Sequence, residues 1–326
     1  MDSGGSSIRV IDGGSRYGLH PTWEDLQHIS TFLLFEPDTE EAERLSRTYR
    51  ERPNITVVQA ALGSTNGAVT LHRAEHHGLT SGFLPNYALL EQHNHKVKEF
   101  AAETSFESQA VTIDSLNWSP DFLKLDIEGN ELAALLGAED ALTASLLGIR
   151  AEVQFHEIWL GAPFFGDIDL HLRQRGFRLL NIDYEGKGVA QTQFADPNRY
   201  GTLMYSDAVW LASSQLLAKR AEIVGAHDGA LSMTKMALFC MNNFAGDVGM
   251  SFAEEVRSII GAPIPVREDP LFSQLEFEVA QHLKGASYVP SVSQAAIDET
   301  YGHLFGSDFP SAHRFYQRPK NLLRPS

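Results

Sequence analysis

The sequence predicts an α/β fold, in which a mainly parallel sheet with flanking helices is followed by a helical C-terminal region. Short apolar, β-rich runs recur between residues 8 and 212, and amphipathic helical stretches separate several of them. Strand-like runs stop beyond about residue 215. Because strands that alternate with helices are typical of right-handed βαβ crossovers, we expect parallel pairing in the first part of the chain.

The apolar runs are short and nearly continuous, which favours strands that are buried on both faces. They are IRVID (8–12), FLLFE (32–36), ITVVQAAL (55–62), FLKLDIE (122–128), IRAEVQF (149–155), FRLLNID (177–183) and DAVWLA (207–212). Helical patterns fall between them at 38–52, 130–142 and 166–176. We therefore expect a first domain over residues 1–213, which either starts abruptly at Ile8 or has lost residues upstream.

An insertion interrupts this alternation. After Leu62, the sequence GSTNGAVTLHR indicates a turn and a short extra strand, and a polar stretch with several histidines follows. We interpret residues 73–110 as a partly helical insertion near the ligand crevice. Residues 214–326 are expected to form a helical C-terminal extension, because apolar residues recur there at helical spacing in 230–244 and 271–285.

Composition and charge exclude several classes of protein. The 326 residues are 43% hydrophobic and 21% charged, which is ordinary for a globular protein. The formal net charge of −16 disfavours binding to a phosphate backbone, so we expect no nucleic-acid partner. The single cysteine, Cys240, excludes an intrachain disulfide. We find neither a signal peptide nor an apolar run that could span a membrane, so we expect a cytoplasmic protein.

A glycine-rich turn follows the first predicted strand, in VIDGGSRYGLHPTW (10–23). Asp12, Gly13, Gly14 and Gly18 are the candidate cofactor-binding residues there, because glycine permits close approach of a ligand to the backbone. A tight turn without a ligand is the alternative. The turn fits the dinucleotide fingerprint poorly, because Ser15 stands where the second glycine would let the backbone approach a pyrophosphate.

Two further strand ends complete a pocket for a nucleoside without a diphosphate. Glu36 ends the second predicted strand, where a carboxylate can accept hydrogen bonds from both hydroxyls of a ribose. Small residues around Ala61 follow the third strand and leave room for a flat adenine ring. S-adenosylmethionine (SAM) fits these features, and ligands of open α/β sheets bind beyond the carboxyl ends of the strands.

Three charged residues alternate along the fourth predicted strand, in FLKLDIE (122–128). Lys124, Asp126 and Glu128 share one face of this strand, because side chains two residues apart point the same way. Burial of unpaired charges is costly, so we expect them to project into the crevice, where they face the sulfonium and an incoming hydroxyl. A self-contained salt-bridge network is the structural alternative.

The chain resembles FkbM-type SAM-dependent methyltransferases. The resemblance is carried by DFLKLDIEGNELAALLGA, VIDGGSRYG, LFEPD, QAALGSTNGAVTLH, VTIDSL and LLGIRAEVQFHE, and it covers roughly residues 8–183. It implies a Rossmann-like fold and methyl transfer from SAM to oxygen, with hydroxyls or acids of sugars and natural products as acceptors. It also implies that Asp12, Gly14 and Gly18 form the cofactor turn, that Glu36 binds ribose, and that Asp126 and Glu128 lie beside the reaction centre. The region after residue 215 has no counterpart that we can place.

Other candidates are weaker. His156 follows the fifth predicted strand at the rim of the crevice and is a candidate base. His76, His77, His93 and His95 suggest a metal cluster, but nothing in the sequence sets their geometry, and we expect no metal site. Asp114 is a cap, a polar edge residue or a functional residue. Ser81 lacks the context of a nucleophile elbow and is a candidate for lining the pocket.

The leading hypothesis is a SAM-dependent O-methyltransferase that acts on a small-molecule or glycan hydroxyl. Lys124, Asp126, Glu128 and His156 are its candidate catalytic residues. An NAD-dependent oxidoreductase is one alternative, and a non-catalytic nucleoside-binding module with a partner-binding helical region is another. The sequence determines neither the acceptor nor the oligomeric state.

Overall fold

The computed structural model describes residues 7–93, 97–182, 186–188, 202–224, 226–243, 245–260 and 270–285. The chain divides into two compact units, Met1–Val279 and Ala280–Ser326. The sheet and the candidate site both belong to the first unit. His95 of the suggested histidine cluster lies outside the described residues.

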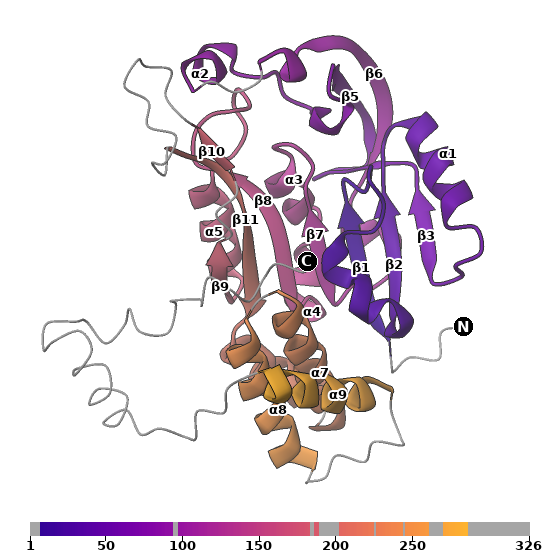
Figure 1. The fold of residues 1–326 in the computed structure, drawn as a ribbon, viewed down its shortest axis with the longest axis vertical. Helices are drawn as coiled ribbons and strands as arrows, with labels where there is room; N and C mark the ends of the chain where they lie inside the picture. The colour runs from indigo at the N-terminus through magenta and orange to yellow at the C-terminus, as the bar shows by residue number, and fades with distance from the viewer. Residues whose placement is uncertain are drawn as a thin grey trace, which may run out of the picture. The chain divides into compact units, whose positions relative to one another are not determined.

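Within the described residues, an eight-stranded sheet forms the centre of the first unit (Figure 1). Its strand order is β10–β11–β8–β7–β1–β2–β3, and β9 pairs with β11. The strands are β1 (Ile8–Gly13), β2 (Ser30–Phe35), β3 (Ile55–Val58), β7 (Phe122–Leu125), β8 (Gly148–Gln154), β9 (Phe177–Ile182), β10 (Gly186–Gly188) and β11 (Thr202–Ala212). The pairs from β3 through β8 are parallel, whereas β11 runs antiparallel to its three neighbours. The predicted mainly parallel α/β sheet is confirmed.

Helices connect the parallel strands as the sequence predicts. They are the 3₁₀ helix η1 (Pro21–Ile29) and the α-helices α1 (Thr39–Thr48), α3 (Glu131–Leu136), α4 (Glu139–Ala144) and α5 (Phe165–Gln174). Asp38 caps α1, since its Oδ1 accepts the backbone N–H groups of Glu40 and Glu41 at 3.0 and 3.3 Å. Asp114 stabilises the first turn of α4 from outside that helix, because its two carboxylate oxygens accept the N–H groups of Asp140 and Ala141 at 2.9 and 3.0 Å. These contacts favour a structural interpretation of Asp114.

The region that the sequence marks as an insertion carries a second, three-stranded sheet in the order β4–β6–β5. Its elements are β4 (Ala61–Leu62), β5 (Gly67–Ala74), η2 (His77–Leu79), α2 (Tyr87–Gln92), η3 (Val97–Phe100) and β6 (Ala102–Val111), with η4 (Ile113–Leu116) following. The sequence indicated the extra strand and the helical content, but not β6. The residues of β6, AETSFESQAV, are mostly polar, and those whose burial is described are exposed or only partly buried, so no buried apolar face marks the strand.

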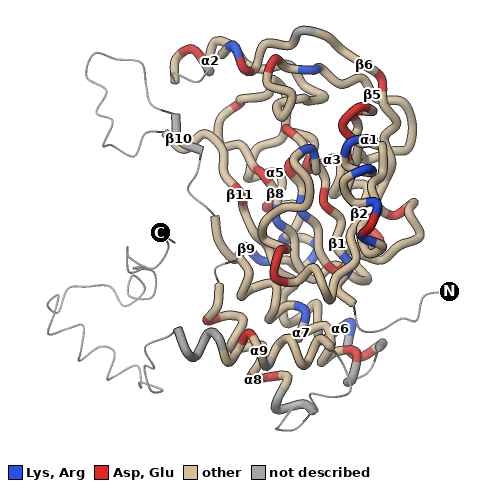
Figure 2. The backbone as a smooth tube through the Cα atoms, turned by 45° about the vertical axis from the view of Figure 1, so that its right-hand side comes forward, with Lys and Arg blue, Asp and Glu red and all other residues tan. Residues whose placement is uncertain are grey.

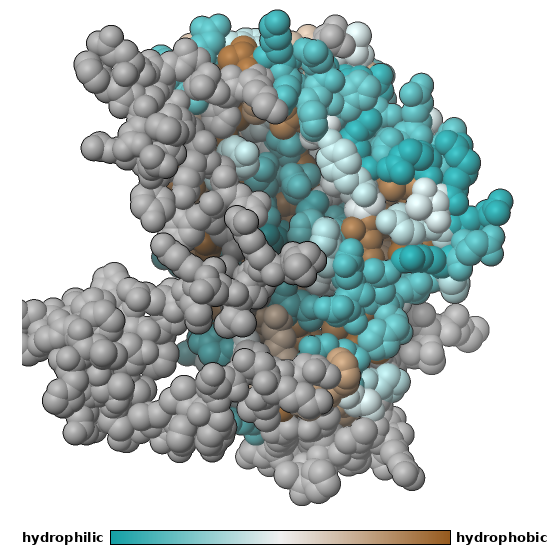
Figure 3. Space-filling view, in the orientation of Figure 1, coloured by the Kyte–Doolittle hydropathy of each residue, from teal (hydrophilic) through white to brown (hydrophobic). Residues whose placement is uncertain are grey.

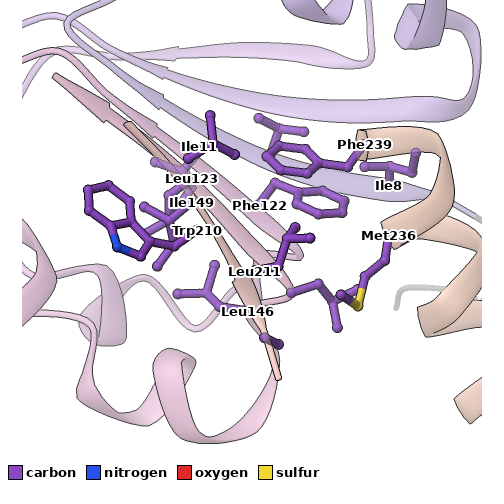
Figure 4. Packing of buried hydrophobic residues seen from close by; sticks show 14 of the residues in the cluster. Ile8, Ile11, Phe122, Leu123, Leu146, Ile149, Trp210, Leu211, Met236 and Phe239 are labelled. Carbon is purple, nitrogen blue, oxygen red and sulfur yellow. The ribbon is translucent and has the colours of Figure 1, made fainter. Parts of the chain in front are cut away.

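In the part of the chain that the structure describes, four helices follow the sheet: α6 (Ser214–Val224), α7 (Ala226–Asn242), α8 (Gly246–Ile260) and α9 (Pro270–Gly285). Phe239 of α7 stacks on Phe122 of β7, with ring centroids 4.4 Å apart and an interplanar angle of 4° (Figure 4). Lys235 of α7 forms a 2.8 Å ion pair with Asp121. The first part of the helical region thus shares the core of the sheet, and the division into domains 1–213 and 214–326 stays a prediction.

Replacement of Phe239 with alanine is expected to lower the free energy of unfolding by about 3–5 kcal/mol. Phe239 is fully buried, and its ring contacts the rings of both Phe122 and Trp23. Urea denaturation of the intact chain measures the loss. The matched control is Phe277→Ala on α9, because Phe277 is 55% exposed. Equal stability of the Phe239→Ala and wild-type proteins would show that α7 does not belong to the core.

Charged residues of both signs are distributed along the described chain, with Lys and Arg interspersed among Asp and Glu (Figure 2). On the face seen in Figure 3, hydrophilic residues predominate over the described part, and hydrophobic residues form smaller patches between them. None of the helices that the structure describes is long and apolar enough to span a membrane.

Candidate active site

The carboxyl ends of β1, β2, β3, β7 and β8 meet at one edge of the sheet, because these strands are parallel. A cavity of about 480 Å³ lies there, large enough for a small-molecule ligand. Figure 1 shows β5, β6 and α2 at this end of the sheet and α7 and α8 at the other. The cavity is lined from the ends of the first sheet's strands by Gly14, Glu36, Ala60, Asp126, Glu128 and Glu152, and from the second sheet and η2 by Ala61, Val69, Leu71, His76, His77 and Leu79, among others.

The structure brings three of the six predicted cofactor-binding residues to this cavity. Gly14, Glu36 and Ala61 line it. Asp12, Gly13 and Gly18 are not among the lining residues, although they support the same turn. Gly18 packs against the hydroxyl of Tyr49, which accepts the backbone N–H of Leu19 at 2.8 Å.

Gly14 joins the turn after β1 to the end of β7. Its φ of +75° lies in the left-handed region, and a Cβ at this position would lie 1.8 Å from the carbonyl oxygen of Asp126. The N–H groups of Gly14 and Ser15 donate to the carbonyl of Phe35 at 3.2 and 3.1 Å. The N–H of Asp126 donates to the carbonyl of Gly13 at 3.2 Å. The backbones of three strand ends therefore meet at this one glycine.

Lys124 is buried beneath the cavity rather than in its wall. Its Nζ lies 3.4 Å from Asp12 Oδ1 and 3.4 Å from Asp126 Oδ2, and it donates to the Gly13 carbonyl at 3.3 Å. Burial alone would lower the pKa of Lys124, but the carboxylates of Asp12 and Asp126 outweigh it and raise the pKa above its ordinary value. Lys124 therefore stays charged and connects the glycine-rich turn after β1 to Asp126.

Glu36 lies at the end of β2 with only 4% of its surface exposed. Its Oε1 accepts the N–H of Asp38 at 2.8 Å. Burial raises the pKa of Glu36 to about 7, although the hydrogen bond from Asp38 and the charge of Arg16 act in the opposite direction. The carboxyl group faces the cavity and changes its charge near neutral pH.

An acidic cluster forms the opposite wall of the cavity. One carboxylate oxygen from each of Asp126, Glu128 and Glu152 lies within 4.8 Å of the others, a spacing that could hold a cation. The side chain of Asp126 is 41% exposed, whereas that of Lys124 is 7% exposed. Asp126 is thus the member of the predicted charged series that both contacts Lys124 and reaches the open cavity.

The pKa values of Glu128 and Glu152 are raised well above their ordinary range. Burial is the largest cause for both, and for Glu128 the charges of Asp126 and Glu131 add to it. A hydrogen bond from Trp159 opposes the shift of Glu128. Because like charges at this separation disfavour simultaneous ionisation, the cluster retains protons near neutral pH.

Sequence reasoning missed Glu152. Its only signal is a charge inside the apolar run IRAEVQF, the same signal that marked Asp126. The register of β7 with β8 pairs Lys124 with Arg150, which places Glu152 at the level of Asp126. The sequence of β7 or of β8 by itself does not show which of their residues lie side by side.

His156 is not among the lining residues of the cavity. It follows β8, and its ring centroid lies 6.1 Å from that of His93. Its assignment as a base stays a prediction. His76 and His77 do line the cavity, and Nη2 of Arg16 donates to Nδ1 of His77 at 3.1 Å. Among the described histidines, no group meets the geometry of a metal site.

One protein-family model matches the chain. Residues 18–179 match the methyltransferase FkbM domain, a range that contains Glu36, Ala61 and the acidic cluster and begins after Gly14. No curated protein matches the chain.

Solved methyltransferase structures resemble the chain only distantly. A methyltransferase FkbM from Methylobacillus flagellatus KT is 16% identical with a TM-score of 0.38, and the match covers 63% of this chain and 43% of that one. A precorrin-6y C5,15-methyltransferase from Geobacter metallireducens GS-15 is 10% identical with a TM-score of 0.32, covering 63% and 80%. The magnesium protoporphyrin IX methyltransferase from Synechocystis PCC 6803, with bound SAM, is 9% identical with a TM-score of 0.33, covering 64% and 71%.

The assignment of the chain to a family rests on the family match and not on the distant structural similarities. The match contains β2, β3, β7 and β8 of the mainly parallel sheet and the cavity-lining residues that follow or end them, but not β1 and Gly14. It supports methyl transfer as the activity class. Through residues 18–179, the chain belongs to the FkbM methyltransferase domain family.

Proposed function

We propose that the protein is a SAM-dependent O-methyltransferase whose acceptor is a hydroxyl of a sugar, glycan or natural product. One observation carries the proposal: Glu36 and Asp126, from two strand ends, line the same cavity. The family match favours methyl transfer over an NAD-dependent oxidoreductase and over a non-catalytic nucleoside-binding module. The expected absence of a nucleic-acid partner and the cytoplasmic location stay predictions.

The residues of the cavity suit the parts of SAM. The carboxylate of Glu36 would accept hydrogen bonds from the ribose hydroxyls, and the small side chains of Ala60 and Ala61 would leave space for adenine. The acidic cluster would face the positively charged sulfonium. Asp12 and Lys124 would act beneath the cavity by holding the turn and Asp126 in place.

SAM supplies the methyl group in such a reaction. Asp126 would accept the proton of the acceptor hydroxyl as that oxygen becomes nucleophilic, because its side chain is 41% exposed and the ion pair with Lys124 favours its charged form. Glu128 and Glu152 have raised pKa values that favour the protonated state near neutral pH. Protonated Glu152 would hydrogen-bond to the acceptor, and Glu128 would lie on the side of the sulfonium, where higher pH favours its carboxylate form. Orientation of the two reactants in one cavity would supply much of the remaining rate enhancement.

Isothermal titration with SAM tests the cofactor assignment, and Glu36→Gln is the informative variant. We expect the substitution to weaken SAM binding by roughly 10–100-fold at pH 8, because it replaces charged hydrogen-bond acceptors by a neutral amide. In wild type, SAM affinity should rise as the pH passes upward through about 7, where Glu36 ionises, and this dependence should disappear in the variant.

The stability of Glu36→Gln checks that the variant folds. The folded-state pKa of Glu36 lies above its ordinary value of 4.5, so its ionisation costs stability as the pH rises through about 7. The glutamine variant should therefore be more stable than wild type at pH 8, by roughly 1–3 kcal/mol. Glu40→Gln is the control, since Glu40 is exposed on α1. Unchanged SAM affinity in Glu36→Gln, or no SAM binding by wild type, would reject the assignment.

A further inference from the structure

Glu128 has an unusual backbone conformation. Its φ is +54°, in the left-handed region, and the other described non-glycine residue with positive φ is Asn117. A residue with a Cβ occupies this region sparsely, and it persists there only where its surroundings hold it. Because the backbone angles set the direction of the side chain, this conformation determines where the Glu128 carboxyl group points.

Ser81 holds the carbonyl group of Glu128. Its Oγ donates to the Glu128 carbonyl oxygen at 2.6 Å and accepts the N–H of Phe83 at 2.9 Å. Ser81 is 1% exposed. Its own backbone pairs with His72 of β5 in both directions, at 2.7 and 3.1 Å. The second sheet therefore holds Ser81 in place, and the hydroxyl proton is directed to Glu128.

The residues around this hydrogen bond are closely packed. Gly129 also has a positive φ, of +94°, and a Cβ there would lie 3.0 Å from Ala162 and 3.2 Å from Phe83. A Cβ on Gly82 would lie 3.0 Å from the side chain of Asn130. Residues 81–83 thus lie directly on the turn that follows Asp126. Among these contacts, the Ser81 hydroxyl makes the hydrogen bond to the strained residue itself.

We propose that Ser81 is a positioning residue, which keeps the Glu128 turn left-handed and thereby holds the Glu128 carboxyl group in the cavity beside Asp126 and Glu152. This inference rests on the proposed function, because it assigns the carboxyl group to the side of the cavity that receives the sulfonium. Without the hydrogen bond, the turn can relax toward ordinary φ values, and the carboxyl group would leave the cluster. The second sheet would then serve to shape the acidic wall.

The test compares the affinities of SAM and S-adenosylhomocysteine, which lacks the positive charge. Titrations are made at pH ~8.5, where ionisation of Glu128 is favoured relative to neutral pH. Ser81→Ala should weaken SAM binding about tenfold and S-adenosylhomocysteine binding less than about twofold, because loss of a nearby carboxylate affects only the charged ligand. Glu128→Gln should weaken the binding of the two ligands by the same factors. The Ser81→Ala/Glu128→Gln double variant should bind SAM no more weakly than either single variant.

Two further variants separate positioning from general destabilisation. Ser206 is also 1% exposed, and its Oγ has no hydrogen-bond partner among the described residues, so Ser206→Ala should leave both affinities unchanged. Ser81→Cys keeps a weak donor on a similar shape and should retain part of the preference for SAM. It also provides the measurement if Ser81→Ala does not fold.

Each outcome decides the inference. Equal weakening of both ligands, an unchanged preference for SAM, or additive losses in the double variant would overturn the assignment of Ser81. In those cases wild-type protein still binds SAM, and the proposed function stands. If wild type binds neither SAM nor S-adenosylhomocysteine, the proposed function fails, and the inference fails with it.

Discussion

Replacement of Asp126 with asparagine is expected to lower the rate of methyl transfer by roughly 10²–10⁴-fold. Asparagine keeps the size and one acceptor oxygen of the side chain, but it cannot take up the proton of the acceptor hydroxyl. Asp126 lies in the cavity and is 41% exposed, so it is accessible to an acceptor. Lys124 keeps Asp12 as an ionic partner at 3.4 Å in the variant, so the turn should remain in place.

The measurement is the transfer of label from methyl-labelled SAM into a cell extract, with mass identification of the product. SAM affinity is measured in parallel and should change by less than about tenfold, because the lost step is chemical. Asp140→Asn is the control, since Asp140 is exposed on α4. Full activity of Asp126→Asn would remove Asp126 from the mechanism. Absence of transfer by wild type would favour the non-catalytic alternative.

Replacement of Gly14 with alanine should destabilise the protein by at least about 3 kcal/mol and abolish SAM binding. The new Cβ would lie 1.8 Å from the Asp126 carbonyl oxygen, in a backbone conformation with φ of +75°. Neither the backbone at Gly14 nor that at Asp126 can move away easily, because hydrogen bonds hold both. Gly14 donates to the Phe35 carbonyl at 3.2 Å, and Asp126 donates to the Gly13 carbonyl at 3.2 Å. If the turn after β1 and the segment after β7 moved apart, the cavity wall between Gly14 and Asp126 would open.

Urea denaturation and titration with SAM measure the two effects. Gly166→Ala is the matched control, because nothing lies within 4 Å of a Cβ at Gly166, and the residue is part of helix α5. That substitution should leave stability unchanged or raise it by up to about 1 kcal/mol, as is usual for alanine in a helix. Wild-type stability together with SAM binding in Gly14→Ala would contradict the role of the glycine.

Local pattern predicted the strands and most of the residues that end them. The runs that became β1, β2, β7 and β8 are short and nearly continuous in apolar residues, so their burial between helices could be predicted from the sequence alone. The carboxyl ends of parallel strands lie at one edge, which is why Gly14, Glu36, Ala61 and Asp126 could be assigned to one cavity in advance. The strand β6 was not predicted, because its residues are mostly polar and leave no periodic apolar face.

Within the candidate site, sequence pattern distinguished charges from apolar neighbours but not buried charges from accessible ones. Lys124 and Asp126 are two residues apart on β7 and carry the same signal, yet one is buried in an ion pair and the other lines the cavity. His156 was placed at the crevice rim by strand order alone, and the cavity lining does not include it. The difference depends on side-chain packing across strands.

The sequence by itself determined the class of the sheet, the order of its strand-ending motifs and the family, because each depends on residues that are close along the chain. Tertiary structure decided that Glu152 joins Asp126 and Glu128, that Ser81 contacts the Glu128 carbonyl, and that Phe239 packs on Phe122. Each of these contacts joins residues more than 20 positions apart. Such contacts depend on the register between strands and on which distant parts of the chain come together. The periodic pattern of a short stretch of sequence specifies neither.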